Sequence, residues 1–303
     1  MGLLNRLLSR VPLLYRAFFP GARWYIPSLE GKSVYLTFDD GPIPEITPWT
    51  LDLLDKYQIK ATFFCVGDNV RKYPQIFEDI KARGHQVGNH TFHHLKALKY
   101  TTTSYMKDVF EAHKLIQSRY FRPPYGHMRL GQMREVSHSF EIIMWDVLTR
   151  DYNHKRSPKQ VLKNVMDYTR NGSIIVFHDS IKSERNLKEA LPQAIEWLLQ
   201  EGYQFKRIGD APYKDATNIS KFPTKLDLVG NSIFKRNLNN LYLDELLIFS
   251  VSSFKDLINS SRFIPLRSLI IRTFALGMMM RANGELSIEK ALLSLGNSCF
   301  SAG

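Results

Sequence analysis

Two short segments of the chain carry side chains that bind divalent metal ions. The first reads TFDDGP and places two adjacent carboxylates, Asp39 and Asp40, before a Gly-Pro turn. The second reads HTFHH and holds His90 and His94 four residues apart, which places both imidazoles on one face of a helix or tight turn. Two histidines and one carboxylate form a common catalytic metal site with positions open for water and substrate. We therefore predict a catalytic divalent metal.

The two carboxylates follow residues 34–38, a run that is typical of a buried strand. Consecutive side chains on an extended backbone point in opposite directions, so the strand must break before both carboxylates can serve one site. One can then bind metal while the other stays free as a base. An isolated Asp-Asp-Gly-Pro segment is most often only a turn, but the histidines favour the metal site. His93 points away from His90 on any regular geometry, and we interpret it as a rim residue.

A structural zinc site is not expected in this chain. Such sites use four protein ligands and are often rich in cysteine, whereas the sequence has only Cys65 and Cys299. The same two cysteines provide no disulfide framework.

Three further segments complete a pattern. They read RPPYG from residue 122, WDVLTRDY from residue 145 and GSIIVFHD from residue 172. With the first two segments, they resemble in order the five motifs of the polysaccharide deacetylase family, also called the NodB-homology or carbohydrate esterase 4 family. The resemblance covers roughly residues 30–210. It implies a metal-dependent hydrolase that removes N-acetyl groups from amino sugars in a glycan, such as peptidoglycan or a chitin-like oligosaccharide, and releases acetate.

The resemblance also implies a role for each motif residue. Asp39 would be the general base, held in place by Arg122, and His178 would be the general acid, oriented by Asp151. A histidine beside a carboxylate suits the task of protonating a leaving amine, because its pKa lies near neutrality. The implied metal ligands are Asp40, His90 and His94. This set accommodates Zn²⁺, Co²⁺, Mn²⁺, Fe²⁺ or Ni²⁺, with Zn²⁺ as the default.

The residues that the resemblance places at the substrate are Pro124, Tyr125, Tyr152, Val176 and Phe177. The backbone N–H of Tyr125 would face the oxyanion, and Val176 and Phe177 would line the acetyl pocket. The fourth motif departs from the family pattern Asp-x-x-Asp-Trp, because Leu148 replaces its first aspartate and Tyr152 its tryptophan. We expect these two changes to affect the shape of the substrate and the rate of the reaction more than the type of reaction.

Two other functions stay open. Some relatives of this family hydrolyse a different carbon-nitrogen bond in a small amide, and the metal ligands alone do not distinguish that reaction. A weakly active glycan-binding protein is the second alternative, but the presence of both Asp39 and His178 argues against it.

Short apolar runs alternate with helical patterns between residues 33 and 208. The predicted strands cover residues 33–38, 61–66, 85–89, 120–123, 140–147, 173–178 and 203–208. The predicted helices cover residues 47–57, 70–83, 102–118, 129–138, 158–170 and 186–201. This alternation predicts an α/β fold with a parallel sheet, and all five motifs fall at or just after strand ends, where α/β barrels build their active sites. Seven strands predict a distorted, partly open barrel, in agreement with the (β/α)7 fold that the resemblance implies.

We predict three parts in the chain: an N-terminal amphipathic segment of residues 1–30, a deacetylase-like domain of residues 31–212, and a C-terminal, helical extension of residues 213–303 without an assigned role. Residues 1–20 alternate apolar pairs with arginines, so neither a cleavable signal peptide nor a transmembrane helix is expected. We expect this segment to pack on its own domain, with peripheral membrane contact as the alternative. A cytoplasmic or peripherally membrane-associated protein is expected.

The composition is that of a globular protein with a basic surface. A hydrophobic content of 44% over 303 residues is ample for a core, and the net charge of +12 favours attraction to anionic surfaces. The basic residues are scattered among acidic ones and no nucleic-acid-binding motif is found, so the expected partner is the glycan and not a nucleic acid. The sequence does not indicate an oligomeric state.

Overall fold

The computed structural model describes Arg16, Phe19 and residues 21–210. The predicted C-terminal extension of residues 213–303 and most of the N-terminal segment fall outside these residues. The predicted domain boundaries therefore stay predictions.

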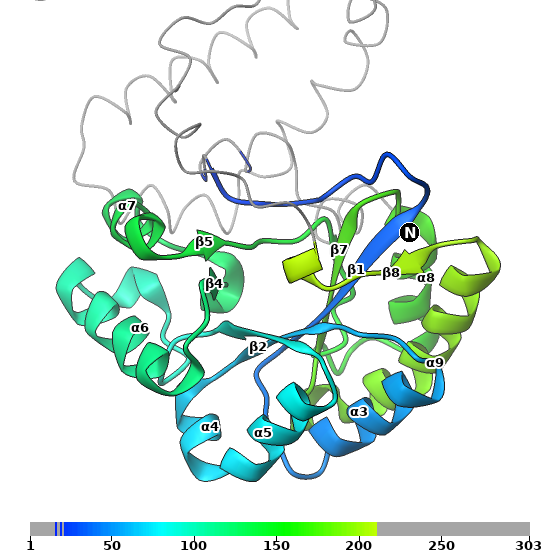
Figure 1. Ribbon diagram of the computed structural model, residues 1–303, viewed down its shortest axis with the longest axis horizontal. Coiled ribbons are helices and arrows are strands. Elements are labelled where there is room, and N and C mark those ends of the chain that lie inside the picture. Colours follow the sequence, from blue (N-terminus) through cyan, green and yellow to red (C-terminus); the bar gives the residue numbers. More distant parts are fainter. Residues whose placement is uncertain (1–15, 17–18, 20, 211–303) are drawn as a thin grey trace, which may run out of the picture. The chain divides into compact units, whose positions relative to one another are not determined.

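The described part of the chain forms one curved sheet in which all the strand pairs are parallel (Figure 1). Its strand order is β5-β4-β3-β2-β1-β7-β6, and β8 pairs with the start of β1. The predicted α/β fold with a partly open barrel is thereby confirmed. The strands are β1 (Ser33–Asp39), β2 (Thr62–Cys65), β3 (Gln86–Asn89), β4 (Tyr120–Phe121), β5 (Glu141–Ile142), β6 (Val147–Leu148), β7 (Ser173–His178) and β8 (Gln204–Phe205).

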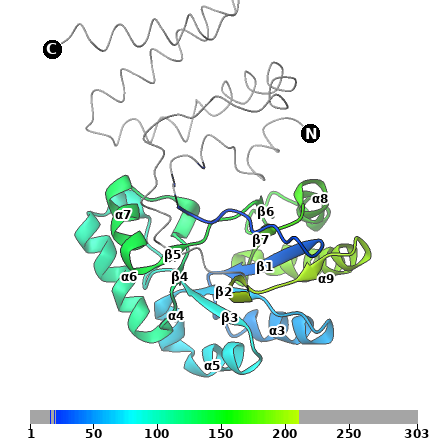
Figure 2. The same ribbon diagram turned by 45° about the horizontal axis from the view of Figure 1, so that its top comes forward.

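Helices lie around the outside of this sheet (Figure 2). They are α3 (Thr47–Lys56), α4 (Gly67–Lys72), α5 (Pro74–Ala82), α6 (Thr102–Ile116), α7 (Leu130–Ser139), α8 (Pro158–Tyr168) and α9 (Glu184–Gln200). Short 3₁₀ turns are η1 (Ala97–Lys99), η2 (Pro124–Gly126), η3 (Ile181–Ser183) and η4 (Ile208–Asp210).

The central strands are buried on both faces and divide their side chains between two environments. Phe38 of β1 stacks on Phe63 of β2 at 4.9 Å, within the core that the sheet shares with the helices. The next side chain back, Thr37, instead points into the barrel, where its hydroxyl accepts a hydrogen bond from Arg122. Because neighbouring side chains on a strand alternate, each strand supplies both the core and the barrel interior. Full burial of each such aromatic side chain contributes about 1.5–3 kcal/mol.

Two predicted elements were wrong in detail. The predicted strand 140–147 is two short strands at different edges of the sheet, β5 beside β4 and β6 beside β7, because the chain between them crosses the opening of the barrel. The predicted helix 70–83 begins at Gly67 and is broken into α4 and α5 before Pro74, whose ring nitrogen has no hydrogen to donate.

The N-terminal segment bridges this opening. The Arg23 amide donates to the Ile142 carbonyl of β5 at 2.8 Å, and the Ile26 amide donates to the Gly172 carbonyl just before β7 at 2.7 Å. Residues 23–26 therefore connect β5 with the residue that precedes β7.

Side chains fix the same segment to the barrel. Phe19 and Trp24 are buried in a core cluster, and the Arg16 guanidinium contacts the buried Asp146 carboxylate at 2.6 Å. The described residues of the segment thus pack on their own domain, whereas most of residues 1–20, to which the alternative of membrane contact applies, fall outside the described part of the chain. Among the described helices, none has the length and apolar character needed to cross a bilayer.

Strands β1, β3 and β7 are parallel, so their C-terminal ends meet at one edge of the sheet. Asp39 ends β1, His178 ends β7 and His90 directly follows β3. In the register of β1 and β7, Asp39 is the direct partner of His178. The fold thus gathers three motifs that are far apart in the sequence.

Candidate active site

The two adjacent carboxylates reach one site because the backbone turns between them. Asp39 is still paired with both neighbouring strands, whereas Asp40 has φ of 84°, in the left-handed region that residues other than glycine rarely adopt. This turn ends the alternation of side-chain directions along the strand, as predicted from the two adjacent carboxylates. Asp40 can then face the histidines while Asp39 faces Arg122.

Three side chains form a potential metal site in the described part of the chain: Asp40, His90 and His94. The Asp40 Oδ1 atom lies 3.1 Å from His94 Nε2 and 3.7 Å from His90 Nε2. Two ligands on a tetrahedral Zn²⁺ with bonds of about 2.05 Å are about 3.3 Å apart, so these separations fit a small divalent ion. His94 itself has φ of 53°, which turns its ring back toward His90, and the two ring centroids are 5.1 Å apart.

His90 is prepared to be a neutral ligand. Its Nδ1 atom lies 2.8 Å from the Arg122 carbonyl oxygen, which can only accept, so Nδ1 carries the hydrogen and Nε2 offers its lone pair toward Asp40. Burial lowers the pKa of His90 to about 4. A metal therefore does not have to displace a proton from this imidazole at neutral pH.

Asp40 is prepared to be an anionic ligand. Burial alone would raise the pKa of its carboxyl group, but the hydrogen bond from His94 and the charges of His178, His94 and His90 lower it well below its usual range. The group is therefore ionised at neutral pH. One anionic oxygen and two imidazoles are a donor set that fits the proposed divalent ion.

Asp39 is separate from this triad and is held by Arg122. One Arg122 guanidinium nitrogen donates to Asp39 Oδ1 at 2.6 Å, and the other nitrogens donate to the carbonyl oxygens of Ile143 and Met144 at 3.1 and 3.0 Å. The whole side chain is buried, with its guanidinium 4.0 Å from the Phe64 ring centroid. A planar guanidinium group that has this many hydrogen-bond partners holds the Asp39 carboxylate in one rotamer.

His178 is held by Asp151. Its Nδ1 atom lies 2.8 Å from Asp151 Oδ1, and its backbone amide donates to Asp151 Oδ2 at 2.7 Å. Burial would lower the pKa of His178, but the charge and hydrogen bond of Asp151, with Asp40 and Asp39, outweigh burial and raise it to about 9. The imidazole is therefore protonated at neutral pH, and its Nε2–H remains available to donate a proton.

Replacing Asp151 by asparagine is expected to shift the pH dependence of catalysis. A histidine is protonated below its pKa, so the acid form of His178 is lost as the pH rises through that value. Without the Asp151 charge, burial dominates and the pKa falls, so the alkaline limb of kcat/KM should move to lower pH. At neutral pH we expect kcat/KM to drop about 10- to 100-fold, less than in His178→Ala. Matching pH–rate profiles of the wild type and Asp151→Asn would contradict this role.

The loop of η2 forms one wall of the site. Tyr125 has φ of 61°, its ring centroid is 4.8 Å from that of His94, and half of its surface is exposed. Among the backbone hydrogen bonds of the described residues, none uses the Tyr125 amide, which leaves it available to an oxyanion. Gly126 keeps the loop close to the core, because a Cβ atom there would lie 2.3 Å from the Trp145 ring. Pro124, at the start of the same turn, is buried.

The opposite wall contains Tyr152, whose ring makes an edge-to-face contact with the His178 ring at 4.9 Å. Val176 precedes His178 by two residues on the same face of β7, so its side chain points into the barrel. The prediction for Phe177 was wrong. Its side chain lies on the other face of β7 and packs on Phe38 in the helix-covered core, so it does not line an acetyl pocket.

His93 lies outside the triad, as the sequence indicated. Its Nδ1 atom contacts Asp108 Oδ1 at 2.6 Å, and 61% of its side chain is exposed. The other oxygen of Asp108 accepts the backbone amides of Phe92 and His93, which ties the loop that carries His90 and His94 to α6.

Asp179 is a buried residue that sequence reasoning did not assign. Its Oδ1 atom accepts the Gly41 amide at 3.0 Å, its Oδ2 atom accepts the Thr47 hydroxyl at 2.6 Å, and its own amide donates to the Asp39 carbonyl at 3.1 Å. It thus connects the end of β7, the turn after Asp40 and the start of α3. Its one signal in the sequence is its place directly after His178 in the last motif.

Gly41→Ala is expected to damage both stability and activity. The new Cβ atom would lie 2.0 Å from Asp179 Oδ2, so the turn that carries Asp39 and Asp40 must move. We expect a loss of about 1–3 kcal/mol in the free energy of unfolding, as for other overpacked sites, with a larger relative loss of kcat/KM. Gly131→Ala in α7, where the nearest atom is 3.4 Å away, is the matched control. Thermal unfolding and kinetics of both variants check this prediction, which fails if the two behave alike.

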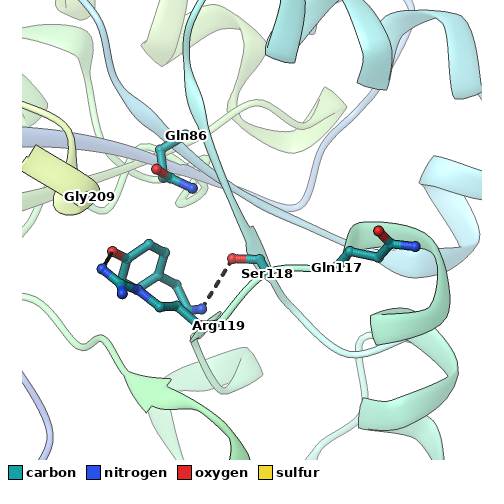
Figure 3. Close-up of a pocket in the computed structure, with 6 residues that line it drawn as sticks. Gln86, Gln117, Ser118, Arg119 and Gly209 are labelled. Atoms are coloured by element: carbon teal, nitrogen blue, oxygen red, sulfur yellow. Dashed lines mark hydrogen bonds between the residues drawn. The ribbon is translucent and has the colours of Figure 1, made fainter. Parts of the chain in front are cut away.

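A polar pocket of about 390 Å³ is lined by the residues drawn in Figure 3. It borders the first residues of β3 and β4, whereas the candidate active site lies at the last residues of β1, β3 and β7. It is therefore not part of that site. Its lining residues are Gln86, Gln117, Ser118, Arg119, Tyr120 and Gly209.

Comparison with known proteins agrees with this geometry. The family profile described as polysaccharide deacetylase matches residues 27–142. A peptidoglycan-N-acetylglucosamine deacetylase of Bacillus cereus is 29% identical over 195 residues, which cover 62% of this chain and 91% of that protein. A chitooligosaccharide deacetylase of Azorhizobium caulinodans is 32% identical over 156 residues, which cover 49% of this chain and 74% of that protein.

The fold is shared as well. A crystal structure of a peptidoglycan N-acetylglucosamine deacetylase superimposes with a TM-score of 0.60 and 28% identity, covering 66% of this chain and 96% of that chain. The family profile covers the first three motifs, and the sequence and fold comparisons agree with it. The chain belongs to the polysaccharide deacetylase family.

Proposed function

We propose that the chain is a metal-dependent hydrolase that removes N-acetyl groups from N-acetylated amino sugars in a glycan and releases acetate. The observation that carries the proposal is the pairing of a fixed carboxylate, Asp39, with a fixed and protonated imidazole, His178, next to the metal triad. The similarity to deacetylases of peptidoglycan and of chitooligosaccharides supports the same reaction.

Asp39 acts as the general base. Its carboxylate lies beside the triad without belonging to it, and Arg122 fixes its orientation through a 2.6 Å contact. It removes a proton from the water that attacks the acetyl carbonyl. Positioned proton transfer of this kind contributes about 10²- to 10⁴-fold to a reaction rate.

The residues that would hold the metal are Asp40, His90 and His94, and we infer Zn²⁺ as its identity. When bound, such an ion polarises the acetyl carbonyl and lowers the pKa of water to about 7. The backbone amide of Tyr125 donates a hydrogen bond to the oxygen that becomes negative during the attack.

His178 acts as the general acid. Amide hydrolysis is slow unless the departing nitrogen is protonated, because an amine anion is a poor leaving group. Asp151 keeps His178 protonated and fixes the ring through Nδ1, so Nε2–H supplies the proton to the amino group of the sugar. The products are acetate and a glycan with a free amine.

The experiment that tests this proposal measures acetate release from N-acetylglucosamine oligomers and peptidoglycan fragments, in parallel with a panel of small N-acetylated amides. We expect release from at least one glycan together with an equal amount of free amine. Hydrolysis of small amides alone would instead favour a small-molecule hydrolase with the same site. Glycan binding without any release would favour a binding protein.

A further inference from the structure

Two cations lie beside tyrosines of the candidate site, Lys96 over the Tyr125 ring and Arg150 at the Tyr152 hydroxyl. On one side, Lys96 Nζ lies 4.7 Å from the centroid of the Tyr125 ring, and that ring in turn contacts His94 at 4.8 Å. Both Lys96 and Tyr125 are exposed. A cation over a tyrosine face is attracted by about 0.5–1 kcal/mol at exposed sites, which favours this placement of the ammonium group at the mouth of the site.

On the His178 side, a cation is hydrogen-bonded to a tyrosine hydroxyl. Tyr152 contacts the His178 ring at 4.9 Å and is 38% exposed. The Arg150 side chain makes this hydrogen bond to the Tyr152 hydroxyl. Burial raises the pKa of Tyr152, and the Arg150 charge and this bond oppose that rise. Arg150 directly precedes Asp151 in the chain and is partly exposed. Arg150 thus contacts Tyr152, which in turn contacts the general acid His178.

The carboxylates of the site do not neutralise these cations. Asp39 pairs with Arg122, Asp40 with the two histidines and Asp151 with His178. Among the described residues, no carboxylate forms an ion pair with Lys96 or Arg150. A bound divalent ion would add further positive charge between them.

We propose that Lys96 and Arg150 are specificity residues that bind carboxylate groups on the glycan, so that the enzyme prefers an anionic glycan over a neutral one. This inference rests on the proposed deacetylase function and narrows its substrate class. A chitin-like oligosaccharide carries no charge, whereas a glycan with N-acetylmuramic acid carries a lactyl carboxylate on every second sugar. Cations that flank the reacting acetamido group attract the anionic glycan and add nothing to the binding of the neutral one.

The test compares two substrates of the same length: a tetrasaccharide of alternating N-acetylglucosamine and N-acetylmuramic acid, and its methyl ester, in which the carboxylates are neutral. In the wild type we expect kcat/KM to be about 10-fold higher for the free carboxylate, since exposed charge pairs each contribute up to about 1 kcal/mol. The preference should shrink between about 10 mM and about 100 mM salt, where the screening length falls from about 30 Å to about 10 Å.

Lys96→Gln and Arg150→Gln should each reduce this preference about threefold, and the double variant should bring it close to one. Lys99→Gln and Lys159→Gln remove the same charge from exposed lysines nearby in sequence and serve as matched controls that keep the preference. Equal kcat/KM for the two substrates in the wild type would overturn the proposal, as would an equal effect of the control variants.

Failure of this inference is distinguishable from failure of the proposed function. Acetate release from the methyl ester and from an N-acetylglucosamine tetramer, without a preference for the carboxylate, would overturn only the role of Lys96 and Arg150. No acetate release from any of the three substrates would overturn the deacetylase function, and the specificity proposal with it.

Discussion

Asp39→Asn is expected to lower kcat about 10²- to 10⁴-fold while the protein still binds its metal. Asparagine has the shape of aspartate and can still accept the Arg122 hydrogen bond, so the turn is preserved. What is lost is the group that takes a proton from the attacking water. Kinetics of acetate release and metal analysis of the same purified sample measure the two effects together.

The adjacent carboxylate provides the matched control. Asp40→Asn changes the same functional group one residue further along, but it removes the anionic ligand of the triad, so we expect the metal to be lost. If Asp39→Asn loses the metal while Asp40→Asn keeps it, the roles of the two residues are reversed. Turnover of Asp39→Asn within tenfold of the wild type would show that the base lies elsewhere.

His90→Ala is expected to abolish both metal binding and turnover. His90 is a buried, neutral ligand whose Nδ1 is fixed by the Arg122 carbonyl, and its removal leaves two of the three candidate ligands in the described part of the chain. Loss of a partner of a ligand typically costs 10- to 100-fold in metal affinity, so loss of the ligand itself should cost more than about 100-fold. Titration of the metal-free protein with Zn²⁺ measures this affinity directly.

His93→Ala is the control for that experiment. It removes a histidine from the same loop, but one that pairs with Asp108 and not with the triad. We expect near-normal metal affinity and only a modest loss of stability. The substitution His90→Ala also leaves a cavity in a buried region. His94 is more exposed than His90, so His94→Ala provides a second test of the ligand set. Full metal occupancy in either triad variant would refute the assignment.

The residue types in the motifs allowed most of the site geometry to be predicted. Carboxylates and histidines at the C-terminal ends of parallel strands must meet at one edge of the sheet, so the proximity of Asp39, His90 and His178 follows from the fold class. The left-handed backbone at Asp40 was also foreseeable, because two adjacent side chains of an unbroken strand cannot share a site.

Other features depend on tertiary contacts that no local pattern encodes. Asp179 gains its role from Gly41 and Thr47, which lie far away in the sequence. The split of the predicted strand 140–147 reflects the opening of the barrel, since that segment alone reads as one apolar run. The error at Phe177 was avoidable, because its neighbour His178 faces the site and alternation places Phe177 on the opposite face.

We infer that a metal at the triad of Asp40, His90 and His94 enables release of acetate from a glycan. The most direct measurement is acetate release by metal-stripped protein, before and after addition of one equivalent of Zn²⁺. We expect little release from the stripped protein and restored release after addition, with no restoration in His90→Ala. Equal release by the stripped and the reconstituted protein would show that the metal is not required.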